Sequence, residues 1–256
     1  MTRPEAESLA GRHAIVTGGG RGIGAAVATA LAGMGARVTI MGRDAKVLNA
    51  HAKSLGDGAL AIACDVADDA SVVTAFAQAG DAYILVNNAG QATSEKFVKT
   101  SAELWSRMLA VNLTSVYHCT RQVLPAMLEA KGGRIVNIAS TAGVQGASRM
   151  AAYAAAKHGV VGLTRSLALE TVKFGVTVNA VCPGFTDTGM TEQGVRELMV
   201  AKNVSHDEAL IMITRTIPSG RLTTPAEVAA AVAWLCGPGA SGVTGQALVV
   251  SGGEVT

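Results

Sequence analysis

A glycine-rich run between an apolar segment and an alanine-rich segment constrains the fold of this chain more than any other feature. The run Thr17–Gly24 reads TGGGRGIG, follows the apolar segment His13–Thr17, and opens a helical stretch at Gly22. Glycine lets a backbone turn sharply and approach a phosphate, and a helix N-terminus offers free N–H groups with a partial positive charge. Because glycines also serve ordinary turns, the interpretation as a dinucleotide-binding turn depends on the strands and helices that follow. The residues predicted to hold the cofactor here are Gly18, Gly20, Arg21, Gly22, Ile23 and Gly24.

Short apolar runs alternate with helical segments along the rest of the chain. Seven of them are predicted as strands: Ala14–Val16, Val38–Met41, Leu60–Ala63, Tyr83–Val86, Ile135–Ile138, Val176–Val181 and Leu248–Val250. Each is continuously hydrophobic, as in strands that are buried on both faces of a parallel sheet. The pattern predicts an α/β fold: a single Rossmann-type, doubly wound domain with a seven-stranded parallel sheet flanked by helices.

The chain contains no linker or internal repeat that would divide it. Its 256 residues, 49% hydrophobic and 16% charged, suffice for one large core. We expect a flexible N-terminal tail at residues 1–10 and one domain at residues 11–256. The segment at about 189–217 is less regular, contains two short amphipathic helices at Val195–Lys202 and Asp207–Thr214, and is predicted to be a substrate lid.

Two sequences are typical of helix starts. Thr224-Pro225-Ala226-Glu227 combines an N-cap hydroxyl, a proline in the first turn and a glutamate that can reach back. Thr100-Ser101-Ala102-Glu103 predicts a similar capping box. Both motifs indicate structure and carry no information about function.

Composition argues against several classes of protein. The net charge is +2, from 21 basic and 19 acidic dispersed residues, so we expect neither a nucleic-acid surface nor an anionic-lipid surface. No apolar run approaches the ~18 residues of a membrane span, and no secretory signal is seen, so we expect no membrane association and a cytoplasmic protein. The five histidines lack metal-ligand spacing and the four cysteines are far apart, so we predict neither a metal site nor a disulfide.

The segment Tyr153–Lys157 supplies a candidate acid for catalysis. Tyr153 and Lys157 share one helix face at spacing i, i+4, and a neighbouring ammonium lowers the pKa of a phenol from about 10. Such pairs are common on ordinary helices. Ser140 strengthens the functional interpretation because it follows the predicted strand Ile135–Ile138, and ligands gather at the carboxyl ends of such strands. Its alternative role is to cap a turn.

These residues carry a family resemblance that extends from His13 to Gly253. The chain resembles the classical short-chain dehydrogenases/reductases, and within them it is most similar to the 3-oxoacyl thioester reductases, which act on carrier-protein or coenzyme A thioesters. The matching motifs are Thr17–Gly24, Asn87-Asn88-Ala89-Gly90, Asn112, Ser140, Tyr153 with Lys157, and Pro183-Gly184 with Thr188.

The resemblance implies a role for each matching residue. Tyr153 would protonate the substrate oxygen, Ser140 would hold that oxygen, and Lys157 would bind the nicotinamide ribose. Asn112 would support a proton relay. The remaining residues implied in cofactor binding are Asp65, Val66, Asn88, Ala89, Gly90, Pro183, Gly184, Thr186 and Thr188: Asp65 and Val66 at the adenine, Asn88 along the adenosine ribose, and Thr186 and Thr188 at the carboxamide.

The end of the second predicted strand distinguishes the two nicotinamide cofactors. An acidic side chain there would accept from a ribose 2′-hydroxyl, whereas arginine attracts a 2′-phosphate. Gly42 occupies the place of the acid, and Arg43 and Arg21 supply cations. We therefore predict NADP(H). NAD(H) remains possible because Asp44 could serve the hydroxyl, although it is also suited to cap the next helix.

The substrate and the assembly are less defined. The lid segment is longer than in the shortest 3-oxoacyl carrier-protein reductases, so a coenzyme A thioester, a cyclic or aromatic ketone, and a secondary alcohol oxidised in catabolism stay open. A dinucleotide-binding regulator without turnover is the alternative from another class. Similar proteins form tetramers through elements equivalent to the helix near Ala151 and the last strand, so the resemblance implies a homotetramer.

Overall fold

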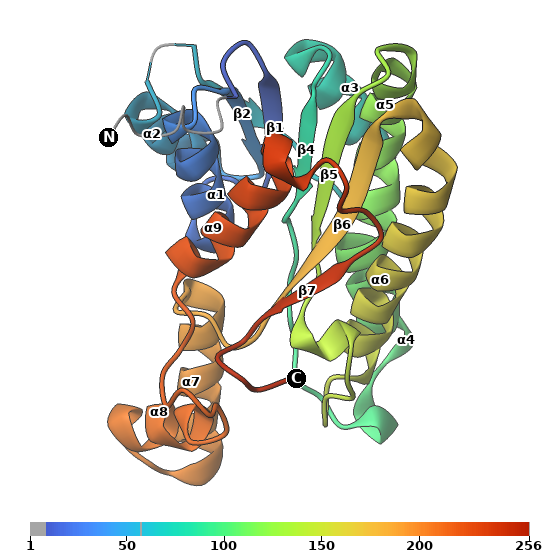
Figure 1. Ribbon diagram of the computed structural model, residues 1–256. Coiled ribbons are helices and arrows are strands. Elements are labelled where there is room, and N and C mark those ends of the chain that lie inside the picture. The colour runs from blue at the N-terminus through green and yellow to red at the C-terminus, as the bar shows by residue number, and fades with distance from the viewer. Residues whose placement is uncertain (1–8, 57, 256) are drawn as a thin grey trace.

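One parallel sheet of seven strands forms the centre of the computed structural model, which describes residues 9–56 and 58–255 (Figure 1). The strands are β1 (His13–Thr17), β2 (Arg37–Gly42), β3 (Leu60–Ala63), β4 (Ile84–Asn87), β5 (Gly133–Ile138), β6 (Val176–Pro183) and β7 (Ala247–Val250). Their order is β3-β2-β1-β4-β5-β6-β7, with every neighbouring pair parallel. The predicted fold class is confirmed. Residues 1–8 of the predicted tail lie outside the described residues.

All seven predicted strands exist, with bounds that agree at β3 and differ by one or two residues elsewhere. The strands β1, β4, β5 and β6 are buried along their whole length. The edge strands differ, since Leu60 of β3 is 40% exposed and all four residues of β7 are half-buried. The expectation that every strand is buried on both faces is therefore wrong at the edges, where a neighbouring strand and part of the helical cover are missing.

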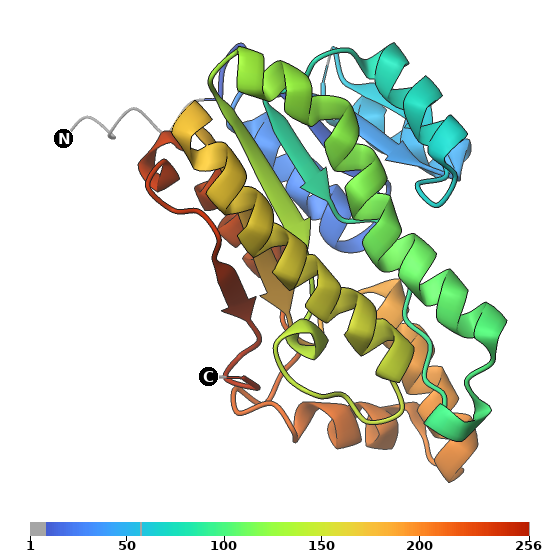
Figure 2. The same cartoon turned by 90° about the vertical axis from the view of Figure 1, so that its right-hand side faces the viewer.

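Helices cover both faces of the sheet (Figures 1 and 2). The α-helices are α1 (Gly22–Gly33), α2 (Ala45–Ser54), α3 (Asp69–Ala79), α4 (Ala102–Leu109), α5 (Ser115–Glu129), α6 (Ala151–Thr171), α7 (Gly189–Lys202), α8 (His206–Thr214) and α9 (Pro225–Cys236). Short 3₁₀ turns lie at Phe97–Lys99, Thr141–Gly143, Val172–Phe174 and Pro238–Ala240, and a π-helical turn at Ala110–Thr114 joins α4 to α5.

Two apolar layers hold these helices on the sheet. On one face, α1, α2 and α9 pack through Leu31, Leu48 and Val232 against strands β1 and β2. On the other, α3 and α5 pack through Phe76 and Val123 against β1, β4 and β5. The helix α6 packs on β6 on this second face, and its N-terminal end lies at the carboxyl ends of the strands (Figure 2).

One of the two predicted helix caps is confirmed. Thr224 Oγ1 accepts from the N–H of Glu227 at 3.2 Å, and the Glu227 carboxylate accepts from the N–H of Thr224 at 2.8 Å. The predicted box at Thr100 is wrong by one residue, because Ser101 caps α4 by accepting from Leu104 N–H at 3.2 Å. The Thr100 hydroxyl instead donates to Lys96 O and closes the preceding turn.

The sheet topology places the predicted site at the carboxyl ends of the strands, which together form one edge of the sheet. The strands β1 and β4 are neighbours. From β1 the chain continues to β2 on one side, and from β4 it continues to β5 on the other side, so the carboxyl ends of β1 and β4 form the switch point of the fold. The glycine run follows β1, Asn88 follows β4, and Ser140 follows β5. The helices α7 and α8 extend beyond this same edge, at the lower left of Figure 1.

Candidate active site

The glycine run forms a tight turn between β1 and α1. Gly18 and Gly22 have φ angles of +65° and +55°, which side chains with a Cβ rarely adopt. A Cβ at Gly24 would overlap the carbonyl oxygen of Gly18 and the amide of Asn88. Within the described chain, the N–H groups of Gly20, Arg21 and Gly22 have no hydrogen-bond acceptor. A backbone that excludes side chains and presents free donors fits the phosphates of a dinucleotide.

Two polar side chains join this turn to the end of β4. Thr17 Oγ1 accepts from the N–H groups of Asn88 and Ala89 at 3.0 and 3.1 Å. In return, Asn88 Nδ2 donates to the carbonyl oxygens of Thr17 and Gly18 at 3.0 and 3.3 Å. The Asn88 amide group therefore holds the turn, in addition to the position along a ribose that its family motif implies. The sequence had not singled out Thr17 as the residue that joins the two loops.

Three of the four predicted catalytic residues meet beyond the end of β5. Ser140 follows this strand, while Tyr153 and Lys157 lie in the first two turns of α6 and are 9% and 4% exposed. The Ser140 hydroxyl lies close enough to the Tyr153 phenol to lower its pKa. It accepts from Ala142 N–H at 3.1 Å, so Ser140 has the alternative role of capping a turn. Lys157 Nζ lies 5.7 Å from the Tyr153 ring centroid and donates to Ile138 O at 2.7 Å.

Burial controls the protonation of this pair. Desolvation raises the pKa of Tyr153 above its ordinary value, and the nearby Ser140 hydroxyl offsets only part of that rise. The expected lowering of the Tyr153 pKa is therefore wrong for the chain alone, because the buried environment outweighs the nearby amine. Burial also lowers the pKa of Lys157 to about 8. At neutral pH the phenol consequently keeps its proton, which is the form a general acid needs.

Asn112 lies in the π-helical turn between α4 and α5 and is fully buried. Its Oδ1 accepts from Gln91 N–H at 3.1 Å, and its Nδ2 donates to the carbonyl oxygens of Gln91 and Met108 at 2.9 and 3.0 Å. A Cβ at Gly90 would lie 2.8 Å from Asn112 Oδ1 and 3.7 Å from Lys157 Nζ. Asn112 thus fixes the loop after β4 close beside Lys157, in agreement with its predicted place in the site.

The two cations predicted to select the cofactor lie at the starts of two helices, Arg21 at α1 and Arg43 just before α2. Asp44 caps this helix by accepting from Val47 N–H at 3.2 Å, as predicted, and its other carboxylate oxygen forms a 3.4 Å ion pair with Arg21. Both partners of this pair are largely exposed. Arg43 is exposed and has no ion pair in the described chain. Two arginines therefore border the end of β2, and Asp44 engages one of them.

The residues predicted at the adenine follow β3, next to this corner. Asp65 Oδ1 accepts from Ala67 N–H at 3.0 Å, and Asp65 N–H donates to Ser71 Oγ at 3.0 Å. The Val66 side chain is buried. These bonds give the loop after β3 a defined shape at the same edge of the sheet as the glycine turn.

The segment after β6 completes the same edge. Pro183 ends the strand, and Thr186 is buried with its hydroxyl donating to Gly184 O at 3.0 Å. Thr188 is the N-cap residue of α7, and its methyl group would lie 3.3 Å from a Cβ on Gly22. The beginning of the predicted lid thus touches the beginning of α1.

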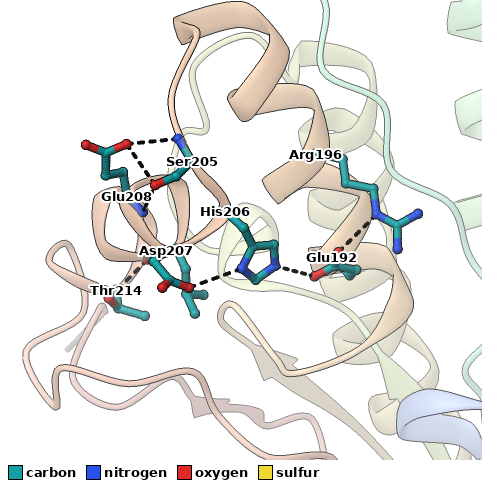
Figure 3. A network of polar contacts seen from close by, with 8 residues as sticks. Glu192, Arg196, Ser205, His206, Asp207, Glu208 and Thr214 are labelled. Atoms are coloured by element: carbon teal, nitrogen blue, oxygen red, sulfur yellow. Dashed lines mark hydrogen bonds and ion pairs between the residues drawn. The ribbon is translucent and has the colours of Figure 1, made fainter.

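The predicted lid consists of two linked helices, α7 and α8, which begin earlier than the sequence indicated (Figure 3). Glu192 of α7 accepts from Arg196 Nε at 3.0 Å and lies 3.0 Å from His206 Nε2 at the start of α8. Its pKa is lowered, most by the bond from His206. Ser205 and Glu208 form a capping box at α8. These bonds tie the two helices into one unit.

Two residues near the site belong to no sequence motif. His51 of α2 contacts the carbonyl oxygen of Gly19 in the glycine turn. Glu254, near the end of the chain, lies against Gly184 and has one buried carboxylate oxygen without a hydrogen-bond partner in the described chain. Burial raises the pKa of Glu254. Both are brought to the site by long-range packing, so spacing along the chain gives no signal for them.

The described residues show no metal cluster, no disulfide and no membrane-spanning helix. They contain no group of three or more histidine, cysteine, aspartate or glutamate residues that could hold a metal ion. The four cysteines, Cys64, Cys119, Cys182 and Cys236, are buried and free. None of the helices described has the length and apolarity needed to cross a membrane.

Comparison with known proteins agrees with this geometry. A family model described as short chain dehydrogenase matches residues 12–198. The granaticin polyketide synthase putative ketoacyl reductase 1 of Streptomyces violaceoruber is 45% identical over 249 residues, which cover 94% of this chain and 92% of the relative. The 3-oxoacyl-[acyl-carrier-protein] reductase FabG of Vibrio cholerae is 38% identical, with coverage of 96% and 98%.

A solved structure is similar over almost the same length. A variant of actinorhodin polyketide ketoreductase, crystallised with NADPH, has a TM-score of 0.90 and 43% sequence identity, and the match covers 95% of this chain and 97% of that one. The likeness therefore extends over nearly the whole of this chain.

Proposed function

Because the chain belongs to the short-chain dehydrogenase/reductase family, and is on that ground an oxidoreductase of carbonyl and alcohol groups, we propose that it reduces a 3-oxoacyl thioester with NADPH. The product is the 3-hydroxyacyl thioester. The observation that carries the proposal is the meeting of Ser140, Tyr153 and Lys157 beside the glycine turn. The ketoacyl reductases among the relatives support the substrate class, and the related structure with NADPH supports the cofactor.

Each residue has a physical task in this proposal. Bound NADPH supplies the hydride. Tyr153 donates its proton to the substrate oxygen, and burial keeps that proton in place at neutral pH until the oxygen gains negative charge. The Ser140 hydroxyl donates a hydrogen bond to the same oxygen and so stabilises the developing charge. Lys157 holds the nicotinamide ribose with its ammonium group, and Asn112 keeps the neighbouring loop in place.

The free donors of the glycine turn and the two arginines that border the end of β2 fit the remainder of NADPH. The turn accommodates the pyrophosphate, and Arg43 with Arg21 attracts the 2′-phosphate. The Arg21–Asp44 ion pair does not oppose this assignment, because an exposed pair contributes little and can rearrange. Asp65, Val66, Asn88, Ala89, Gly90, Pro183, Gly184, Thr186 and Thr188 form the rest of the proposed cofactor site.

The helices α7 and α8 serve as the proposed lid, at about residues 189–217. Within these helices, Val195 and Ala209 are buried, while Met190 and Met212 are 48% and 36% exposed. Flexible methionines on a movable element suit an acyl chain of variable shape. Arg196 forms its ion pair with Glu192 of the same helix, so this arginine is engaged by a residue of the lid.

The experiment that tests the function compares substrates and one variant. Wild-type enzyme is assayed with NADPH and acetoacetyl-coenzyme A, its carrier-protein analogue, a cyclic ketone and an aromatic ketone. We expect turnover of the thioesters, and Tyr153→Phe should lower kcat about 10²- to 10⁴-fold while leaving the Kd for NADPH unchanged. Turnover of the simple ketones alone would refute the thioester substrate. Binding of NADPH without any turnover would favour the alternative of a dinucleotide-binding regulator.

We also propose a homotetramer in the cytoplasm. On α6, Ala155 and Gly162 face outward, with open space around Gly162 and an 81% exposed Leu169 about two turns further. Ala156 and Gly159 do not contribute, since one is fully buried and the other packs on Leu113. The half-buried edge strand β7 is a second candidate contact. Light scattering that reports a stable monomer would contradict the tetramer.

Free buried cysteines are compatible with a reducing compartment such as the proposed cytoplasm.

A further inference from the structure

We propose that His51 is a positioning residue for cofactor binding, which holds the Gly19–Gly20 peptide so that its N–H faces the phosphates of NADPH. The proposal rests on the proposed use of this cofactor. It concerns a residue of α2 that belongs to none of the motifs described above.

The contact that carries the proposal joins two elements that are far apart in the sequence. His51 Nδ1 lies 2.8 Å from the carbonyl oxygen of Gly19, and its Nε2 lies 3.3 Å from Thr29 Oγ1 of α1. A carbonyl oxygen only accepts hydrogen bonds, so Nδ1 must carry the hydrogen and donate it. In the described chain, this imidazole is the single donor to Gly19 O.

Peptide geometry links this bond to the cofactor. In a planar trans peptide, the C=O of one residue and the N–H of the next point in opposite directions. While His51 holds the carbonyl oxygen of Gly19 toward α2, the N–H of Gly20 points away from α2. That N–H is one of the donors without an acceptor in the described chain.

The peptide needs such a restraint because glycine stands on both sides of it. Glycine has a wide choice of backbone angles, so neither residue by itself prevents this peptide from turning over. The preceding peptides are already restrained: Gly18 N–H and Gly19 N–H donate to Met41 O at 2.7 and 3.3 Å, and Asn88 holds Gly18 O. A reversed Gly19–Gly20 peptide would aim a carbonyl oxygen at the phosphates and repel them.

The helix α2 is itself fixed against the glycine turn, so it can present His51 accurately. Asp44, Leu48 and His51 recur at the spacing of one helix face. Asp44 pairs with Arg21, and Leu48 is buried. A Cβ on Gly20 would lie 3.0 Å from a methyl group of Val47 and 3.4 Å from one of Leu48. This face of α2 thus lies against three successive residues of the turn, Gly19, Gly20 and Arg21.

The test compares two replacements of His51 that differ in one donor. His51→Leu removes the hydrogen bond, whereas the Nδ2 of His51→Asn occupies the place of the imidazole Nδ1 and keeps a donor. Ser54→Ala is the matched control, because it removes another side-chain bond of α2, from Ser54 Oγ to His51 O at 2.7 Å, without touching the turn. The Kd of NADPH is measured by fluorescence titration, and KM and kcat are measured with an acyl thioester.

We expect His51→Leu to raise the Kd and KM for NADPH about three- to ten-fold, the effect of one net hydrogen bond, with kcat unchanged. His51→Asn should return both constants to within about two-fold of wild type, and Ser54→Ala should leave them unchanged. If His51→Leu does not fold, His51→Ala replaces it in the comparison with His51→Asn.

Three results would overturn the proposal: wild-type affinity in His51→Leu, equal weakening in His51→Asn, or a similar loss in Ser54→Ala, which would indicate a general loosening of α2. Because NADPH binding is measured without a ketone, these results are independent of the substrate. Failure of the wild-type enzyme to reduce any thioester would refute the proposed function and leave the binding comparison intact.

Discussion

Raising the pH from 7 to 9 should weaken the binding of NADPH through one residue, Lys157. Its side chain is 4% exposed and donates to Ile138 O, and burial lowers its pKa to about 8. With this pKa, about nine-tenths of the side chains are protonated at pH 7 and about one-tenth at pH 9. If the ribose is held by the ammonium form, the Kd should rise about ten-fold over this range, equivalent to about 1.4 kcal/mol.

The assay is a fluorescence titration of the cofactor at pH 7, 8 and 9 and constant ionic strength. Lys157→Met is titrated in parallel. Its affinity should be lower than that of wild type at pH 7 and should change little with pH, since it lacks the titrating group. The 2′-phosphate does not contribute to the slope, because a phosphate monoester with a second pKa near ~6 is already ionised at pH 7.

Two results would refute this reasoning. The first is a wild-type Kd that changes less than about two-fold between pH 7 and 9, because the fraction of ammonium falls about ten-fold. The second is a Lys157→Met variant with the same pH slope as wild type, which would assign the titration to another group. A steeper slope in wild type than in the variant supports the assignment.

Three further predictions concern other parts of the molecule. Gly24→Ala places a methyl group against Gly18 O and Asn88, so it should destabilise the protein by about 1–3 kcal/mol in urea denaturation and raise the Kd for NADPH; unchanged values would contradict the close packing of the turn. Thr224→Ala removes the N-cap of α9 and should lower the free energy of unfolding by about 1 kcal/mol without altering kcat, which urea denaturation and steady-state assays would check. Glu254 has a raised pKa in the folded state, so the stability it contributes is present at low pH and is lost as the pH rises from its ordinary value of 4.5 through the raised one. Melting temperatures of wild type should therefore fall relative to Glu254→Gln between pH 5 and 8, and parallel curves would show that Glu254 does not titrate in this range.

The sequence predicts those elements best that depend only on residues close together in the chain. Strands buried on both sides produce continuous apolar runs, and all seven predicted strands exist. The cap at Thr224 depends on neighbours within three residues and was identified correctly. The cap at Thr100 was placed one residue early, because its hydroxyl closes a preceding turn that the sequence does not announce.

Properties that depend on residues distant in the sequence required the structure. Spacing alone showed that Tyr153 and Lys157 share a helix face, yet it predicted the wrong direction for the Tyr153 pKa, since spacing does not report desolvation. The bond between His51 and Gly19 O joins residues 32 positions apart, and Glu254 reaches Gly184 only through the last strand. No motif encodes either contact.

The sequence by itself determined the order of strands and helices, the glycine turn, and the residues placed after each strand, because these depend on short-range periodicity and backbone freedom. Tertiary structure decided which of those residues meet at one edge of the sheet, which protons they hold, and which outlying side chains restrain them. Protonation and restraint arise from burial and from long-range contacts, and these exist only once the chain has packed.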